Sequence, residues 1–231
     1  MSRPAEVSFL VDLVRVVPAC LGRAELTKIK RPCYFPKMSK GEETRQMILR
    51  IGLDMASELG LEAVTIGALA KRVAMSKSGL FAHFQSKENL QIAILDFAGD
   101  LFGEIVMRPA LQKPAGLDRI RALLANWIAW SNQLAGGCIF VVAANEFGDR
   151  PGVVRDFLVR QQERWHESLS RLAASAVKAG DFQPGIDCDQ FAFELYSLML
   201  GFHLYNKLLY SENSAAREQR ALEQLLSHYR G

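Results

Sequence analysis

Three helical patterns in close succession, each preceded by a capping residue, constrain the fold of this chain more than any other feature. The capping residues carry hydroxyl side chains, which favour helix N-caps: Thr65, Ser76 and Ser86. Apolar residues then recur at helical spacing over residues 66–73, 77–83 and 87–107, and the third pattern ends before Pro109. A helix, a short turn and a second helix form the unit that inserts its second helix into a DNA major groove.

Helical patterns also fill the rest of the chain, and strand-like alternation persists nowhere. One pattern runs from Glu42 to Leu59 and ends at Gly60. The others are separated by Gly- and Pro-containing stretches and cover Leu117–Leu134, Cys138–Phe147, Val153–Ala179, Asp187–Leu209 and Ala215–Tyr229. We therefore expect an all-α protein with a helix-turn-helix DNA-binding domain at residues 38–90 and a helical domain at residues 91–231.

Composition excludes several classes of protein. The chain has 231 residues, of which 49% are hydrophobic and 23% charged, as is typical of a soluble globular protein. The four cysteines lie far apart and without metal-ligand spacing, which favours reduced thiols in a cytoplasmic protein. The longest uncharged run, Ala122–Asn145, contains amide side chains and the Gly136-Gly137 pair, so neither a membrane span nor a membrane partner is expected.

The basic character of the chain resides in its first 37 residues. They hold seven Lys and Arg against three Asp and Glu, whereas residues 38–231 hold 21 against 22. Four prolines interrupt this segment, which favours a poorly ordered extension upstream of a native start at Met38. The alternative is a basic arm that reaches into a DNA minor groove.

Residues 44–95 carry a specific set of residues at fixed spacing. They are Thr44-Arg45, Ile48-Leu49, Gly60, Thr65-Ile66, Leu69-Ala70, Val73, Ser76–Phe84 and Ser86–Leu90. This set resembles the DNA-binding region of the TetR/AcrR (tetracycline-repressor) family. A later set resembles one branch of that family: Gly136-Gly137-Cys138, Glu146-Phe147, Arg150-Pro151-Gly152 and Val154-Arg155-Asp156. The resemblance implies a homodimeric bacterial repressor whose C-terminal domain binds a small molecule.

The expected recognition helix is short, so few of its side chains can reach base edges. We expect base contacts from Lys77, Ser78, Gly79 and Ala82. Phosphate contacts are expected at helix N-termini and at the end of the recognition helix, from Thr65, Lys87 and His83. Phe81 stands where the family usually has Tyr, so a phenol-to-phosphate hydrogen bond is not possible, and Leu80, Phe81 and Phe84 are expected in the core.

Sequence-specific binding requires two copies of such a nearly neutral domain on a palindromic double-stranded operator. The last two long helices suit a four-helix bundle between the copies. The candidate interface residues are Phe191, Leu195, Leu198, Phe202, Leu222, Leu225 and Leu226. About half of them are equally consistent with the core of a single copy.

Aromatic walls with a few polar groups suit a small organic effector. The candidates are Trp127, Trp130, Cys138, Phe140, Asn145, Glu146, Trp165, His166, Tyr196 and His203. Polar side chains among apolar helices need a partner, which a ligand can provide. Cys138 would sense electrophiles only with a lowered pKa, and no cationic residue lies close to it in the sequence.

Catalysis is not expected, and no cofactor or metal is implied. Glu163 and His166 have the spacing of a di-iron ligand pair in a helix bundle, but no second pair exists. Motifs of hydrolases, P-loop proteins and zinc proteases do not occur either. We expect a ligand-responsive repressor in which the effector shifts the helix at residues 87–107. The alternatives are a small-molecule-binding helical protein without specific DNA readout and a helical metalloenzyme.

Overall fold

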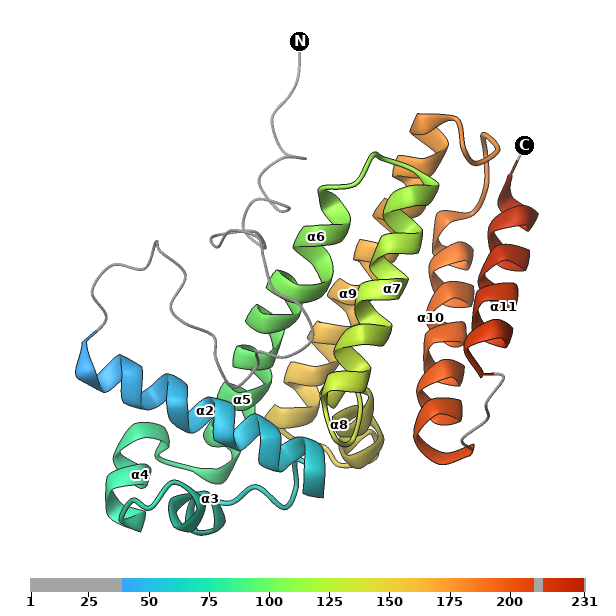
Figure 1. The fold of residues 1–231 in the computed structure, drawn as a ribbon. Helices are drawn as coiled ribbons and strands as arrows, with labels where there is room; N and C mark the ends of the chain where they lie inside the picture. The colour runs from blue at the N-terminus through green and yellow to red at the C-terminus, as the bar shows by residue number, and fades with distance from the viewer. Residues whose placement is uncertain (1–38, 210–213, 231) are drawn as a thin grey trace.

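The protein is helical wherever the computed structural model describes it, residues 39–209 and 214–230, and no strand occurs there (Figure 1). The N-terminal helices are α2 (Lys40–Leu59), α3 (Ile66–Arg72) and α4 (Lys77–Phe84). A long helix follows in three segments, α5 (Lys87–Phe102), the π-helical η2 (Gly103–Met107) and α6 (Arg108–Leu111). The remaining elements are α7 (Leu117–Gln133), α8 (Ile139–Phe147), α9 (Val153–Ala179), α10 (Cys188–Leu204), the π-helical η3 (Tyr205–Leu209) and α11 (Ser214–Tyr229). The extension expected at residues 1–37 lies outside the described residues, as does Met38.

The three predicted capping residues begin the helices that follow them. Each hydroxyl accepts a hydrogen bond from a backbone N–H in the first turn: Thr65 from Ala68, Ser76 from Gly79 and Ser86 from Asn89, at 3.0–3.1 Å. These bonds satisfy N–H groups that have no partner within the helix. The helix-turn-helix unit formed by α3 and α4 is therefore defined by local side-chain chemistry, as the sequence predicted.

The helix α4 has one buried and one exposed face. Leu80 is fully buried and Phe84 nearly so, and the Arg45 guanidinium lies 5.1 Å from the centre of the Phe84 ring. The prediction that Phe81 joins this core is wrong, because 51% of its surface is exposed. Successive residues are rotated by about 100° around a helix, so with Leu80 and Phe84 facing inward the intervening Phe81 is turned toward solvent.

The prediction that the helix beginning at Lys87 ends before Pro109 is also wrong. Residues of η2 form a π-helical turn immediately before the proline, and the helix continues through α6 to Leu111. Proline has no N–H and its ring crowds the carbonyl four residues earlier, that of Ile105. A widened turn at this point changes the spacing of the carbonyls and allows the helix to pass the proline.

The C-terminal helices form a bundle into which α5 leads from the N-terminal helices (Figure 1). In it α7, α9 and α10 lie side by side, and α11 packs against α10 at one edge. Its apolar faces meet in a core that includes the fully buried Leu169, Phe191, Leu195 and Met199. No helix among the described residues combines the length and apolar character needed to cross a membrane.

Candidate DNA interface and ligand core

The exposed face of α4 carries most of the residues expected to read DNA. Lys77, Ser78 and Ala82 are exposed, whereas Gly79 and His83 are half-buried. The Ser78 hydroxyl lies 3.2 Å from that of the capping Ser76, which positions it at the start of the helix. The structure thus presents these side chains on the surface of the recognition helix, and their contacts with DNA stay predictions.

Two of the three residues expected at phosphates already have partners within the protein. The Thr65 hydroxyl accepts the N–H of Ala68, and the Lys87 ammonium donates to Glu62 Oε1 at 2.6 Å. An ammonium has two further N–H donors, so the phosphate contacts of both residues stay predictions.

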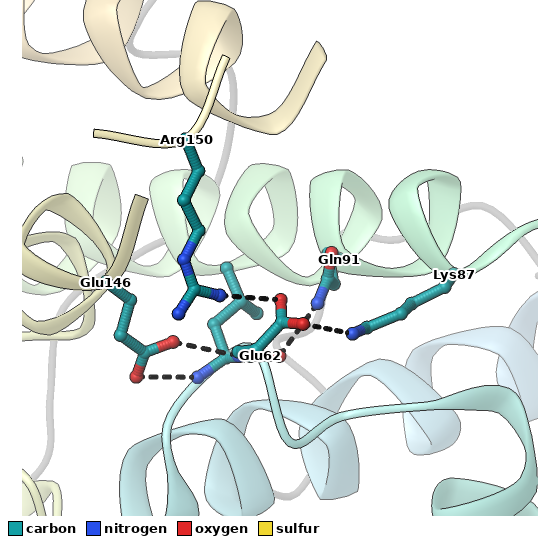
Figure 2. Close-up of polar contacts among 6 residues, drawn as sticks. Glu62, Lys87, Gln91, Glu146 and Arg150 are labelled. Atoms are coloured by element: carbon teal, nitrogen blue, oxygen red, sulfur yellow. Dashed lines mark hydrogen bonds and ion pairs between the residues drawn. The ribbon is translucent and has the colours of Figure 1, made fainter. Parts of the chain in front are cut away.

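A carboxylate from α8 holds the loop between α2 and α3 by its backbone (Figure 2). Glu146 accepts the N–H of Leu61 at 3.1 Å through one oxygen and the N–H of Glu62 at 2.8 Å through the other. Charge-assisted hydrogen bonds of this kind are about twice as strong as neutral ones. Glu146 was expected to face a ligand, but the structure uses its carboxylate to join the C-terminal helices to the helix-turn-helix.

Two residues of α5 hold the same loop from another side (Figure 2). Gln91 is 1% exposed and donates from Nε2 to the Leu61 carbonyl at 2.9 Å. The hydrogen bond from Lys87 holds the pKa of Glu62 below its ordinary value. Arg150 lies 3.6 Å from the other oxygen of Glu62. We call this contact the junction and define it as Leu61, Glu62, Lys87, Gln91, Glu146 and Arg150.

Two glycines allow the backbones to approach at the junction and beside it. Gly60 has φ +88°, and a Cβ there would lie 2.2 Å from a carboxylate oxygen of Glu146. Gly136 donates its N–H to the Ser57 hydroxyl at 2.9 Å, and a Cβ there would lie 2.1 Å from the Ser57 carbonyl oxygen. Because these clashes involve backbone or a bonded carboxylate, any larger residue would force the end of α2 away from the C-terminal helices.

Further from the N-terminal helices, Phe102 of α5 lies at the centre of a group of aromatic rings. Its ring centre is 6.0 Å from that of Trp130, 5.9 Å from Phe140 and 5.2 Å from Trp165, in edge-to-face arrangements. We call these four residues the aromatic core. Phe102 was not among the predicted ligand residues. Its signal was weak, because one phenylalanine within a regular helical pattern is indistinguishable from an ordinary packing residue.

Neutral polar groups occur beside the aromatic core. Burial raises the pKa of the Cys138 thiol, and the backbone N–H groups of Val141 and Phe140 and the indole N–H of Trp127 are among the groups that oppose this shift. Burial also raises the pKa of Tyr196 to about 12, while its hydroxyl donates to Gln162 at 2.5 Å. A thiol with a raised pKa is a poor nucleophile at neutral pH, so Cys138 is not suited to sensing electrophiles.

The remaining predicted ligand residues lie in different surroundings. Asn145 is exposed on α8, which corrects its assignment to a ligand core, and His166 is half-buried on α9. His203 lies beside the Gly136-Gly137 pair, because a Cβ on Gly137 would be 2.3 Å from the His203 Nε2. Burial and the Lys207 ammonium lower the pKa of His203, which keeps the imidazole neutral at pH 7.

The structure contradicts the assignment of most of the predicted residues to a dimer interface. Five of them are buried within a single copy and cannot contact a second one: Phe191, Leu195, Phe202, Leu222 and Leu226. Leu198 and Leu225 are half-buried and line a groove between α10 and α11 together with Phe193. The helix α10 is thus apolar on both faces, and periodicity alone did not distinguish its inward face from its outward one.

Among the described residues, no three His, Cys, Asp or Glu side chains lie close enough together to hold a metal ion. The Glu163 and His166 pair accordingly stands without further ligands in this part of the chain.

The junction makes a first prediction. In Glu146→Gln, one carboxylate oxygen is replaced by an amide donor that faces a backbone N–H, and a buried N–H without an acceptor costs about 1–3 kcal/mol. We expect amide hydrogen exchange in a peptide spanning residues 57–64 to accelerate about tenfold or more, since about 1.4 kcal/mol corresponds to a factor of ten. The exposed neighbour Asn145→Ala is the control and should leave exchange unchanged. Unaltered exchange in Glu146→Gln would contradict the assigned role.

Comparison with known proteins agrees with this architecture. Residues 48–94 match the family model described as bacterial regulatory proteins, tetR family, and residues 116–222 match the tetracyclin repressor-like C-terminal domain. A curated relative, the HTH-type transcriptional repressor KstR2 of Mycolicibacterium smegmatis, is 26% identical over 157 residues, which are 65% of this chain and 73% of KstR2.

Several solved structures share the fold of this chain at low sequence identity. A TetR transcriptional regulator from Chloroflexus aurantiacus superposes with a TM-score of 0.72 at 24% identity, covering 83% of this chain and 96% of that one. AibR, solved with isovaleryl coenzyme A and operator DNA, superposes with a TM-score of 0.60 at 20% identity, covering 80% and 96%. With both of its regions matched, the chain belongs to the TetR family of ligand-responsive, DNA-binding transcriptional regulators.

Proposed function

We propose that the protein is a homodimeric repressor that binds a palindromic operator and leaves it when a small organic effector enters the C-terminal helices. The observation that carries this proposal is that the same two helices connect the aromatic core to the helix-turn-helix. α5 carries Phe102 in the aromatic core and Gln91 at the junction, and α8 carries Phe140 and Glu146 at the corresponding places.

This arrangement supports a mechanism. A ligand that displaces Phe102 or Phe140 moves α5 or α8, and each of these helices holds the α2–α3 loop by hydrogen bonds. The orientation of α4 relative to the C-terminal helices then changes. A differential affinity of about 5.5 kcal/mol moves a two-state equilibrium from 1:99 to 99:1, so a few kcal/mol suffice to regulate DNA binding. We propose domains at residues 38–90 and 91–231, with α5 contributing to both.

The effector region favours an uncharged, largely apolar molecule with a hydrogen-bond acceptor. Trp130 is 3% exposed, and its Nε1 is buried without a hydrogen-bond partner among the described residues. Buried donors of this kind need an acceptor, which a ligand can supply. AibR, a protein with this fold, was solved in complex with isovaleryl coenzyme A and operator DNA, which supports an organic molecule as the proposed ligand.

Dimerisation follows from the need for two recognition helices about 34–36 Å apart on successive major grooves. The outward face of α10 supports an interface with a second copy, because Phe193, Leu200 and Leu204 expose 61%, 40% and 49% of their surfaces. The adjoining groove is lined by Leu198 and Leu225. Because the proposed partner is bacterial operator DNA, the proposed site of action is the cytoplasm, and no catalytic role is proposed.

Selection of bound fragments from a random duplex library tests DNA recognition. We expect the wild type to enrich a palindromic motif and Lys77→Ala to weaken or relax it, at a cost of about 1–3 kcal/mol for a lost base contact. Lys178→Ala, an exposed lysine at the end of α9, serves as the control and should enrich the wild-type motif. Weak binding that shows no sequence preference in any variant would favour the alternative, a helical small-molecule-binding protein without specific DNA readout.

Sedimentation velocity tests the dimer surface. Phe193→Asp places a charge on the exposed face of α10, and we expect it to make the free energy of dimerisation less favourable by about 2 kcal/mol or more, as for an aromatic side chain central to an interface. Val159→Asp, on the exposed side of α9, should leave the dimer intact. An unchanged dimer in Phe193→Asp would place the interface elsewhere.

Intrinsic fluorescence tests the effector region, because all three tryptophans of the chain are candidate ligand residues, and Trp130 and Trp165 belong to the aromatic core. Compounds that release the protein from its operator should change tryptophan emission.

We expect release of Phe102→Ala from the operator to require an about tenfold higher concentration of such a compound, since aromatic contacts contribute about 0.5–1.5 kcal/mol beyond area burial. Phe182→Leu, in the distant cluster with Phe191 and Tyr229, is the control. An equal response in Phe102→Ala would exclude the aromatic core as the effector site.

A further inference from the structure

The half-exposed ring of Phe81 has no evident role in the fold. Leu80 and Phe84, at 0% and 3% exposure, already hold α4 against the other helices, whereas Phe81 exposes 51% of its surface. Exposed apolar surface costs about 25 cal/mol per Å² relative to buried surface. On the exposed face of the recognition helix, this ring is available to a partner outside the protomer.

Helix geometry places this ring among the residues expected to read bases. Phe81 is four residues after Lys77, and Ala82 is four residues after Ser78, so each pair lies on one strip of the helix surface. All four residues are exposed. If Lys77 and Ser78 enter a major groove in the first turn of α4, Phe81 and Ala82 follow them into the same groove one turn later.

The chemistry of the side chain limits what it can recognise there. Phenylalanine has no hydrogen-bond donor or acceptor, so it reads neither the polar edges of bases nor phosphate oxygens. The one apolar group that distinguishes base pairs in the major groove is the 5-methyl group of thymine. Resting on the proposed operator binding, we propose that Phe81, with Ala82 beside it, selects a thymine in each operator half-site through contact with that methyl group.

Replacement of single thymines by deoxyuridine in the selected operator tests this directly, because it removes only the methyl group. With wild-type protein, one thymine per half-site should show a loss of about fourfold in affinity on substitution, the value for one buried methyl-sized group. Phe81→Ala should bind the unmodified operator more weakly and show no further loss at that position. A ring that rested on deoxyribose instead would give weaker binding in Phe81→Ala with no sensitivity to deoxyuridine.

Two controls separate recognition from folding. Leu59→Ala removes another exposed apolar side chain, on α2, and should retain the full deoxyuridine effect. Phe81→Ala should unfold thermally like the wild type, since its ring is half-exposed, and Phe81→Leu should retain part of the discrimination through its apolar tip. Equal sensitivity to deoxyuridine in wild type and Phe81→Ala, or none in the wild type, overturns the inference alone. Failure of the wild type to select any operator overturns the proposed function as well.

Discussion

One carboxylate ties the loop that leads into the helix-turn-helix to the C-terminal helices. Glu146 is attached to the C-terminal helices, yet both of its oxygens accept backbone N–H groups of the loop that leads into α3. Loop N–H groups have no helical partner of their own, so a carboxylate is an effective way to fix them. Because the bonds are made to backbone, they specify the path of the loop rather than the identity of its side chains.

The surrounding groups make this contact specific. Gln91 donates a hydrogen bond to the Leu61 carbonyl from the opposite side. Lys87 and Arg150 neutralise Glu62, the loop carboxylate that lies near Glu146. Without these cations, two carboxylates would stand close together and repel each other. The ammonium of Lys87 is therefore part of the structural contact, although its position at a helix start suggested a role toward DNA.

The sequence predicted those features that depend on neighbouring residues and missed those that depend on distant ones. The capping residues Thr65, Ser76 and Ser86, the helix-turn-helix and the all-α architecture follow from local chemistry, and the structure confirms them. The family was likewise recognisable from a long run of spaced residues.

The passage of the helix through Pro109 was missed because a proline is locally a stop signal and a π-helical turn has no sequence signature of its own. The exposure of Phe81 and the burial of Phe191 are set by which neighbours cover each helix face, which one sequence does not reveal. Glu146 and its partners are 84 and 85 residues apart, so only the fold brings them together.

The division of α4 into two faces has an evolutionary consequence. Leu80 and Phe84 are buried in the core, whereas Lys77, Ser78, Phe81 and Ala82 are exposed. Substitutions on the exposed face usually change stability by no more than about 0.5 kcal/mol. With the DNA contacts proposed above, a duplicated copy of this chain could diverge toward a new target sequence by changing those four positions, while inheriting its fold and its junction without alteration.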